Sequence, residues 1–281
     1  MTQANGAQML PELLEHQATG QIAVIYEEIR RFSGVPYVSS LQRYVATMPG
    51  ALEWAWAAVR PALASGAIQE TGWRLARDVT IPAAPKISAA ALRVWGVDAA
   101  GLTAIRNIAE NFVRVSPVNL MTGACLRLLL DGARPAGPGF PTDWAPPALL
   151  PPMPGNADPA ALAPETNAVL MQLATELGGK PFIPALYRQL AHWPGFLAWV
   201  ATELGPRFTA PETNAARASF RQAAWDAASA IVARLPPLPP GPAPDAATTR
   251  AVLVAIDRYA GTSPEMTLFG RLLRDATPIT F

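Results

Sequence analysis

The side chains that most often carry catalysis are scarce in this sequence. It contains two histidines, His16 and His192, in different regions, and a single cysteine, Cys125. Metal sites need clustered His, Cys, Asp or Glu ligands, and redox-active thiols usually need a second cysteine at short spacing. Because neither pattern occurs, we expect no metal and no cofactor, and we expect Cys125 to be a small buried residue at a helix contact.

Motifs for nucleotide binding and acyl transfer do not occur either. The sequence has no G-x-G-x-x-G or G-x-x-x-x-G-K-[ST] loop for phosphates, and no G-x-S-x-G nucleophile elbow. Two arginines, Arg43 and Arg188, occupy matching places in a repeated segment. Two roles are open for them: one or both neutralise a substrate carboxylate, or they are structural arginines that bond helix ends.

That repeated segment is the strongest feature of the organisation. Residues 34–61 and 179–206 align without a gap at a shift of 145 residues, with ten identical positions out of twenty-eight. A second match, at a shift of 147, relates residues 115–117 to residues 262–264. We therefore predict two similar halves, residues 1–130 and 160–281, related by a pseudo-twofold axis, with a cleft between them.

Helical periodicity dominates both halves. Ile22, Ile25 and Ile29 recur at helical spacing, no segment alternates convincingly with a period of two, and alanine, the best helix former, is abundant. The predicted fold class is all-α. We expect a helix to end before Pro117 and another to begin after it. In the second half we expect helices over residues 162–177, 184–193, 195–204, 213–234, 245–260 and 264–275.

Composition limits the partners. Residues 131–159 are rich in proline and glycine and read as a stiff linker between the halves. The net charge is +1 and only 15% of residues are charged, which argues against nucleic acid or an anionic membrane as a partner. The N-terminal residues lack the features of a signal peptide. We expect a cytoplasmic protein with a small-molecule ligand, and a homodimer is compatible with the sequence.

The chain resembles the group I 2-haloacid dehalogenases, which accept D and L substrates. The resembling residues are 26–30, 35–38, 46–50, 190–194 and 258–259. The resemblance spans most of the chain, including the duplication and the proline-rich connector. It implies a cofactor-free helical pseudo-dimer in which an aspartate of the second repeat activates water, and the water displaces halide from C2 of a short 2-halo acid.

The sequence departs from the family pattern at these positions. The resemblance places the family's aspartate at Leu186, its asparagine at Ser116 and a pocket tyrosine at Ile256, and Tyr37 replaces a tryptophan. A leucine cannot accept a proton, so the family's base is missing. The residues that we expect to bind the substrate are Tyr37, Ser40, Ser116, Ala185, Leu186, Ile256 and Tyr259.

These residues leave open whether the protein is an enzyme. One reading is a 2-haloacid dehalogenase-like hydrolase in which Asp257 or Glu110 replaces the missing base. A second reading is a homologue that does not dehalogenate and binds or transforms another small apolar acid or ketone. A third reading is a catalytically silent helical scaffold with a filled cleft. A cavity lined by a carboxylate would favour the first reading, and a cavity with Arg or Ser but no carboxylate the second.

Overall fold

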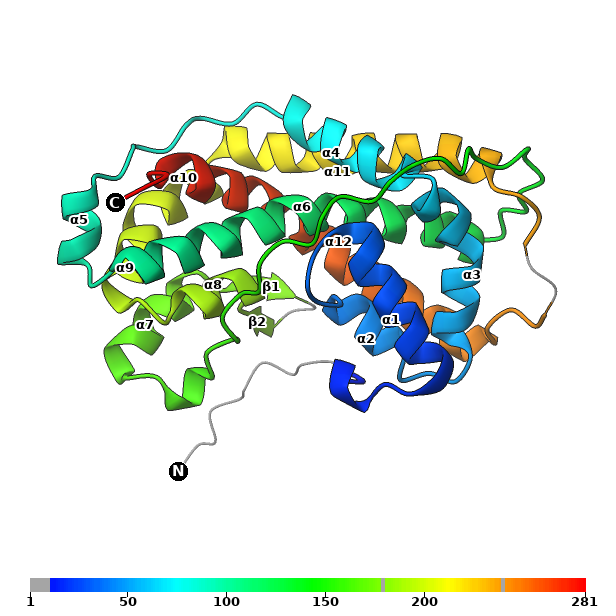
Figure 1. Cartoon of the computed structure of the whole chain (residues 1–281), viewed down its shortest axis with the longest axis horizontal. Coiled ribbons are helices and arrows are strands. Elements are labelled where there is room, and N and C mark those ends of the chain that lie inside the picture. Colours follow the sequence, from blue (N-terminus) through cyan, green and yellow to red (C-terminus); the bar gives the residue numbers. More distant parts are fainter. Residues whose placement is uncertain (1–10, 178–179, 239–240) are drawn as a thin grey trace.

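The computed structural model describes residues 11–177, 180–238 and 241–281, and within them it is built almost entirely from helices (Figure 1). The predicted all-α class is confirmed. The one pair of strands in the described residues, β1 and β2, forms a short antiparallel ribbon in which Thr175 pairs with Phe182. The elements in chain order are a 3₁₀ turn (Glu15–Gln17), α1 (Gly20–Ser33), α2 (Ser40–Val45), α3 (Ala51–Ala64), α4 (Ala67–Asp78), α5 (Ala89–Val94), α6 (Ala99–Leu130), a second 3₁₀ turn (Pro159–Ala161), α7 (Pro164–Gln172), β1 (Thr175–Leu177), β2 (Lys180–Phe182), α8 (Ala185–Leu190), α9 (Pro194–Trp199), a π-helical turn (Val200–Leu204), α10 (Gly205–Thr209), α11 (Pro211–Arg234) and α12 (Ala246–Ala276).

Two long helices, α6 and α12, pack along each other through the centre of the molecule (Figure 1). Both begin in the same way, because the side chains of Asp98 and Asp245 accept hydrogen bonds of 2.7 Å from the backbone N–H groups three residues later. Helices α4 and α11 pack against α6. The central pair therefore provides the frame on which the shorter helices are arranged.

Each central helix contains a proline, and the predicted breaks near Pro117 and Pro264 are wrong because both helices continue through them. A proline inside a helix removes one backbone hydrogen bond, so neighbouring groups must support the turn. In α6 the indole N–H of Trp73 donates to the carbonyl of Arg114 at 2.8 Å, one turn before Pro117. Tertiary contacts thus overcome the local preference to end the helix.

The described residues form two hydrophobic cores, and α6 and α12 contribute to both. The first core lies under α1 and α3 and contains Ile25, Met121 and Ile256. The second lies under α8 and α9 and contains Ile105 and Phe269. The N-terminal part of α6 therefore belongs to the second core and its C-terminal part to the first, and α12 crosses in the opposite order. Each core draws residues from both sides of the connector.

The connector, residues 131–159, forms no helix or strand along residues 133–158, which the structure describes in full, and crosses the face of the molecule (Figure 1). The backbone N–H of Leu150 donates to Gly34 at 3.0 Å, and that of Ala157 donates to Arg188 at 3.2 Å. The indole of Trp144 lies so close to Gly66 that a Cβ there would come within 2.4 Å of it. The connector is thus held on both halves by specific contacts.

Helix positions follow the offsets of the sequence match. Helix α2 begins at Ser40 and α8 begins 145 residues later at Ala185, while α6 begins at Ala99 and α12 begins 147 residues later at Ala246. The duplication itself stays a prediction, which these offsets support. The predicted helix over residues 162–177 is wrong in its second half, because α7 ends at Gln172 and the chain turns into β1.

Helix α6 is, in the part of the chain that the structure describes, the one helix long and apolar enough to cross a membrane by length and composition. Its most apolar window has a mean hydropathy of 1.2, but 67% of that window is buried inside the protein. This is the burial of a core helix.

Candidate functional site

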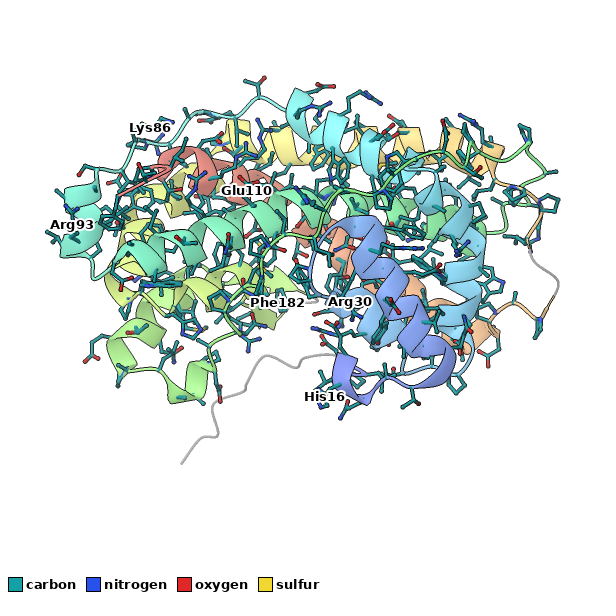
Figure 2. All side chains as sticks on the ribbon, viewed as in Figure 1. His16, Arg30, Lys86, Arg93, Glu110 and Phe182 are labelled. Carbon is teal, nitrogen blue, oxygen red and sulfur yellow. The ribbon has the colours of Figure 1, made fainter. Side chains whose placement is uncertain are left out.

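A cavity of about 320 Å³ lies where α2, α6, α8 and α12 meet under the connector. One wall comes from Tyr37 and the start of α2, and the opposite wall from Phe182 and the start of α8 (Phe182 is labelled in Figure 2). Residues from both predicted halves therefore line one space. The lining residues are Pro36, Tyr37, Val38, Ser39, Ser40, Arg43, Phe112, Val115, Ser116, Asn119, Pro152, Met153, Pro154, Gly155, Asn156, Phe182, Pro184, Ala185, Gln189, Tyr259, Thr262, Ser263 and Met266.

Two polar atoms of this lining have no hydrogen-bond partner among the described residues. They are the hydroxyl oxygen of Tyr37 and the side-chain oxygen of Gln189, and neither is accessible to solvent. A buried polar group left unpaired costs about 1–3 kcal/mol. Burial raises the pKa of Tyr37 well above its ordinary value, and the nearby cation of Arg43 only partly opposes this. Tyr37 is therefore a neutral hydroxyl with a hydrogen to donate.

The one arginine of the cavity, Arg43, is already engaged by acidic residues. Its Nε donates to Glu12 at 2.8 Å, its Nη1 lies 3.9 Å from Glu15, and its Nη2 donates to the hydroxyl of Ser40 at 3.3 Å. Arg188, its counterpart in the repeat, lies outside the cavity lining and donates to the backbone carbonyl of Ala157 at 3.2 Å. Of the two predicted roles, Arg188 shows the structural one, and Arg43 combines an ion pair with a place at the cavity.

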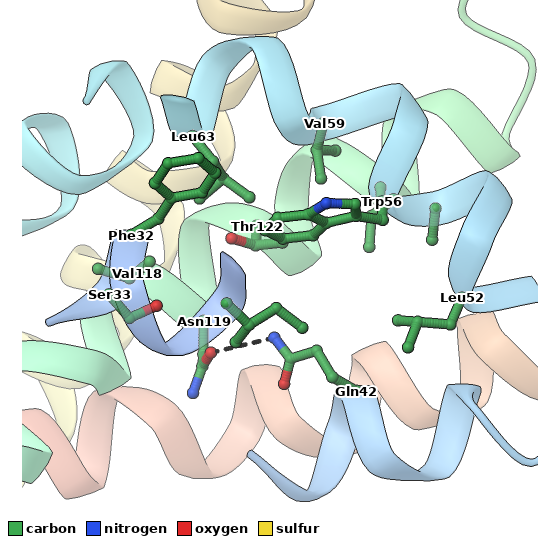
Figure 3. A pocket seen from close by; sticks show the side chains of 13 residues that line it. Phe32, Ser33, Gln42, Leu52, Trp56, Val59, Leu63, Val118, Asn119 and Thr122 are labelled. Atoms are coloured by element: carbon green, nitrogen blue, oxygen red, sulfur yellow. Dashed lines mark hydrogen bonds between the residues drawn. The ribbon is translucent and has the colours of Figure 1, made fainter. Parts of the chain in front are cut away.

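The far side of the cavity carries further hydroxyl and amide groups. Tyr259 shares a side-chain hydrogen bond with Ser40; burial raises the pKa of Tyr259 to about 12, and this bond moderates the rise. The side-chain oxygen of Asn119 accepts a bond from the amide of Gln42 at 3.3 Å (Figure 3). Asn119 also lines a second pocket of about 30 Å³ among Phe32, Trp56 and other residues of the first core (Figure 3). The amide of Asn119 thus separates the cavity from this water-sized space.

Five of the seven residues predicted to bind substrate line the cavity: Tyr37, Ser40, Ser116, Ala185 and Tyr259. The other two lie elsewhere. Leu186 is completely buried in the second core, and Ile256 is 1% exposed in the first. Successive residues of a helix point about 100° apart, so the neighbour of a cavity residue faces a different element.

Helical spacing identifies polar residues that the sequence analysis missed. Gln189 lies one turn after Ala185, Asn119 one turn after Ser116, and Ser263 one turn after Tyr259, and all three line the cavity. Residues three or four positions apart share a helix face. Extending each candidate by one turn would have found them.

Carboxylates lie outside the described lining of the cavity. Asp257, considered as a replacement base, is mostly exposed and pairs with Arg127 at 2.5 Å. Glu110, the other candidate, lies in a separate groove, 4.0 Å from Arg274. Neither reaches the cavity, so the sequence-based suggestion that one of them activates water there has no geometric support.

Glu265 is the nearest buried acid along the chain, next to the lining residue Met266. Its carboxylate accepts bonds from the hydroxyl of Tyr187 at 2.7 Å and from Arg217 at 3.0 Å. Burial raises the pKa of Glu265, and the bonds from Tyr187 and Arg217 offset this only in part. The carboxylate is thus committed to a buried cluster of three side chains.

The remaining candidates for chemistry are dispersed. No group of three or more His, Cys, Asp or Glu side chains converges within the described ranges. His192 bonds the backbone carbonyl of Gly155 at 2.8 Å. Cys125 is completely buried, and burial raises the pKa of its thiol to about 12. This is the environment of an inert packing residue.

No family model matches the chain, and no curated protein matches it. Solved structures of similar fold do match. One is a D-2-haloacid dehalogenase mutant with D-2-CPA, with a TM-score of 0.70, 20% identity and 95% of each chain covered. A second mutant structure gives the same values, and the D-2-haloacid dehalogenase with L-LA gives a TM-score of 0.71 and 21% identity over 95% of this chain and 96% of the other. The chain therefore has the fold of these D-2-haloacid dehalogenase structures.

Proposed function

We propose that the protein is a dehalogenase-like homologue that binds a short carboxylic acid in the cavity between α2, α6, α8 and α12 without hydrolysing a carbon–halogen bond. One observation carries the proposal: hydroxyl, amide and guanidinium groups line the cavity, and no carboxylate does among the described side chains. Direct attack by water requires a base within hydrogen-bond reach to accept its proton. The second of the three sequence-based readings is therefore preferred.

The polar groups of the cavity suit the recognition of an acid. Tyr37 is a neutral donor with no described partner, and the amide nitrogen of Asn119 and the hydroxyl of Ser116 are further donors for ligand oxygens. Gln189 offers an acceptor for a ligand hydroxyl or N–H. A ligand that pairs with Tyr37 and Gln189 removes the free-energy cost of two unpaired buried atoms.

The dimensions of the cavity favour a small ligand with an apolar part. About 320 Å³ lies at the lower end of the 300–1,000 Å³ that is usual for ligand pockets. Phe112, Val115 and Met266 form apolar parts of the wall. A short acid with an alkyl or halogen substituent at C2 fits both the size and the chemistry, and a small ketone is the related alternative.

Other features of the protein are proposals of the same standing. The duplicated halves, divided at residues 130 and 160, are supported by the equal offsets of α2 and α8 and of α6 and α12. A cytoplasmic localisation, a homodimer and the absence of a nucleic-acid or membrane partner stay predictions from composition.

The proposal is tested by titrating the protein with D- and L-2-chloropropionate and with propionate, by calorimetry, while halide release is assayed separately. We expect saturable binding and no halide release above background. Tyr37→Phe should weaken binding about threefold to tenfold, the value of one hydrogen bond. Tyr44→Phe, on the same helix and outside the cavity, is the matched control and should leave binding unchanged. Absence of binding, or halide release that exceeds background, would overturn the proposal.

A further inference from the structure

A second hollow, of about 350 Å³, opens on the outer side of α4, α6 and α12 and shares no residue with the cavity. We call it the arginine groove. Glu110, on the outer side of α6, marks its position in Figure 2. Its lining residues are Trp73, Ala76, Arg77, Glu110, Val113, Arg114, Pro147, Arg271 and Arg274.

The charge of this groove is unlike that of the chain as a whole. Four arginines, Arg77, Arg114, Arg271 and Arg274, face one carboxylate, Glu110, which gives a formal charge of +3 in a chain whose net charge is +1. Three helices far apart in sequence contribute them. Like charges gathered in one hollow repel each other, so a bound anion would stabilise this arrangement.

Two of the four arginines bond to the backbone and pair with no carboxylate in the described part of the chain. Arg114 donates to the carbonyl of Ala148 at 2.9 Å, and Arg271 donates to the carbonyl of Val79 at 2.9 Å. Burial lowers the pKa of both guanidinium groups, and for Arg271 the neighbouring cation of Arg274 lowers it further. These carbonyl bonds fix the guanidinium groups in place and leave other N–H donors of each fork unused.

The other two arginines are the more accessible pair. Arg274 pairs with Asp275 at 2.9 Å and lies 4.0 Å from Glu110. Arg77 is exposed and forms no ion pair with the described residues. The groove thus combines a fixed, half-buried pair of cations with a mobile pair at its rim.

We propose that the arginine groove binds a phosphoryl group, either on a small molecule or as free phosphate. A phosphate monoester carries between one and two negative charges near neutral pH and three strong acceptor oxygens. Planar guanidinium forks match these oxygens, and a monocarboxylate would neutralise less of the charge. The half-buried ring of Trp73 provides an apolar wall beside the arginines for the organic part of a phosphorylated ligand.

The test uses the full chain and two probes, inorganic phosphate and adenosine monophosphate, titrated at low ionic strength while the guanidinium Nε–H signals of ¹⁵N-labelled protein are followed. We expect saturable shifts in arginine signals and an affinity that falls as salt is raised. Tighter binding of the nucleotide would assign the ligand as a phosphorylated small molecule, and equal affinity would assign it as free phosphate.

Variants of the exposed arginines locate the site. The double variant Arg77→Ala, Arg274→Ala should weaken phosphate binding at least fivefold, and 2-chloropropionate binding to the cavity should be unchanged. Arg74→Ala is the matched control, because Arg74 is exposed on the same helix as Arg77 and lies outside the groove. Absence of phosphate binding, or equal weakening by Arg74→Ala, would overturn the assignment.

Discussion

Leu186 is turned into the second core, whereas Gln189, three residues further along α8, lines the cavity. The cavity-facing side of this helix is set by Ala185 and Gln189, which point about 40° apart at 3.6 residues per turn. The leucine that resemblance places at the family's catalytic position is thus a packing residue here. Two predictions about α8 follow from this orientation.

Replacing Leu186 by aspartate should destabilise the fold strongly. The change removes a completely buried leucine, which costs about 2–5 kcal/mol when it is truncated, and it places a carboxyl group among apolar side chains. We expect the free energy of unfolding to fall by at least ~3 kcal/mol at pH 7 in denaturant titrations. Because a buried carboxyl group is tolerated better when protonated, the loss should shrink as the pH is lowered.

Leu186→Asn is the control, since it has a similar shape to the aspartate variant and does not ionise. It should be destabilised without the same pH dependence. A Leu186→Asp protein that is as stable as the wild type and that releases halide from 2-chloropropionate would contradict this account, because it would place residue 186 at the cavity.

Replacing Gln189 by glutamate should instead put a carboxylate inside the cavity with little change of shape. Gln189 is 6% exposed and its side-chain oxygen has no described partner, so burial should raise the pKa of the new carboxyl group. At pH 7 its ionised fraction would repel an acidic ligand. We expect the affinity for propionate to fall at least tenfold at pH 7 and to recover toward pH 5, as measured by calorimetry.

The propionate affinity of the wild type over the same pH range is the reference for this variant. A Gln189→Glu affinity that follows the wild-type profile would mean that residue 189 does not face the bound acid. The same variant also reports on catalysis: halide release from it would show that a carboxylate is the one group that the cavity lacks.

The helical class and the connector could be predicted because they depend on local properties. Alanine content and helical periodicity favour α-helix wherever they occur, and the proline-rich residues 131–159 cannot form either regular structure. Pro117 and Pro264 misled the prediction because both helices are held by neighbours across the turn that contains the proline. Such support comes from residues distant in sequence, and no local pattern reports it.

The cavity was predicted at the level of segments and less well at the level of single side chains. Resemblance and the repeat identified the start of α2, the middle of α6 and the start of α8, where Tyr37, Ser116 and Ala185 do line the cavity. It misplaced Leu186 and Ile256 by one step of helical rotation. That rotation is decided by how α8 and α12 pack against the two cores, which depends on all their neighbours at once.

The cluster of Tyr187, Glu265 and Arg217 beside the cavity predicts a pH dependence of stability. Burial holds the pKa of Glu265 above its ordinary value of 4.5 in the folded protein. The folded state therefore binds more protons than the unfolded state between the two pKa values, and the stability contributed by Glu265 is fully present below the unfolded pKa and is lost as the pH rises through the folded one. The loss amounts to about 1.4 kcal/mol for each unit between them.

Glu265→Gln removes this titration, so the comparison isolates it from every other acid in the chain. The unfolding free energy of the wild type minus that of Glu265→Gln should decline as the pH is raised from 4 and become constant once Glu265 is ionised. Tyr187→Phe deletes a hydrogen bond that lowers the pKa of Glu265, so in that background the decline should extend to higher pH. Denaturant titrations at four or five pH values provide the measurement. A difference that rises with pH would mean that the ion pair with Arg217 outweighs burial, and the assigned direction of the shift would then be wrong.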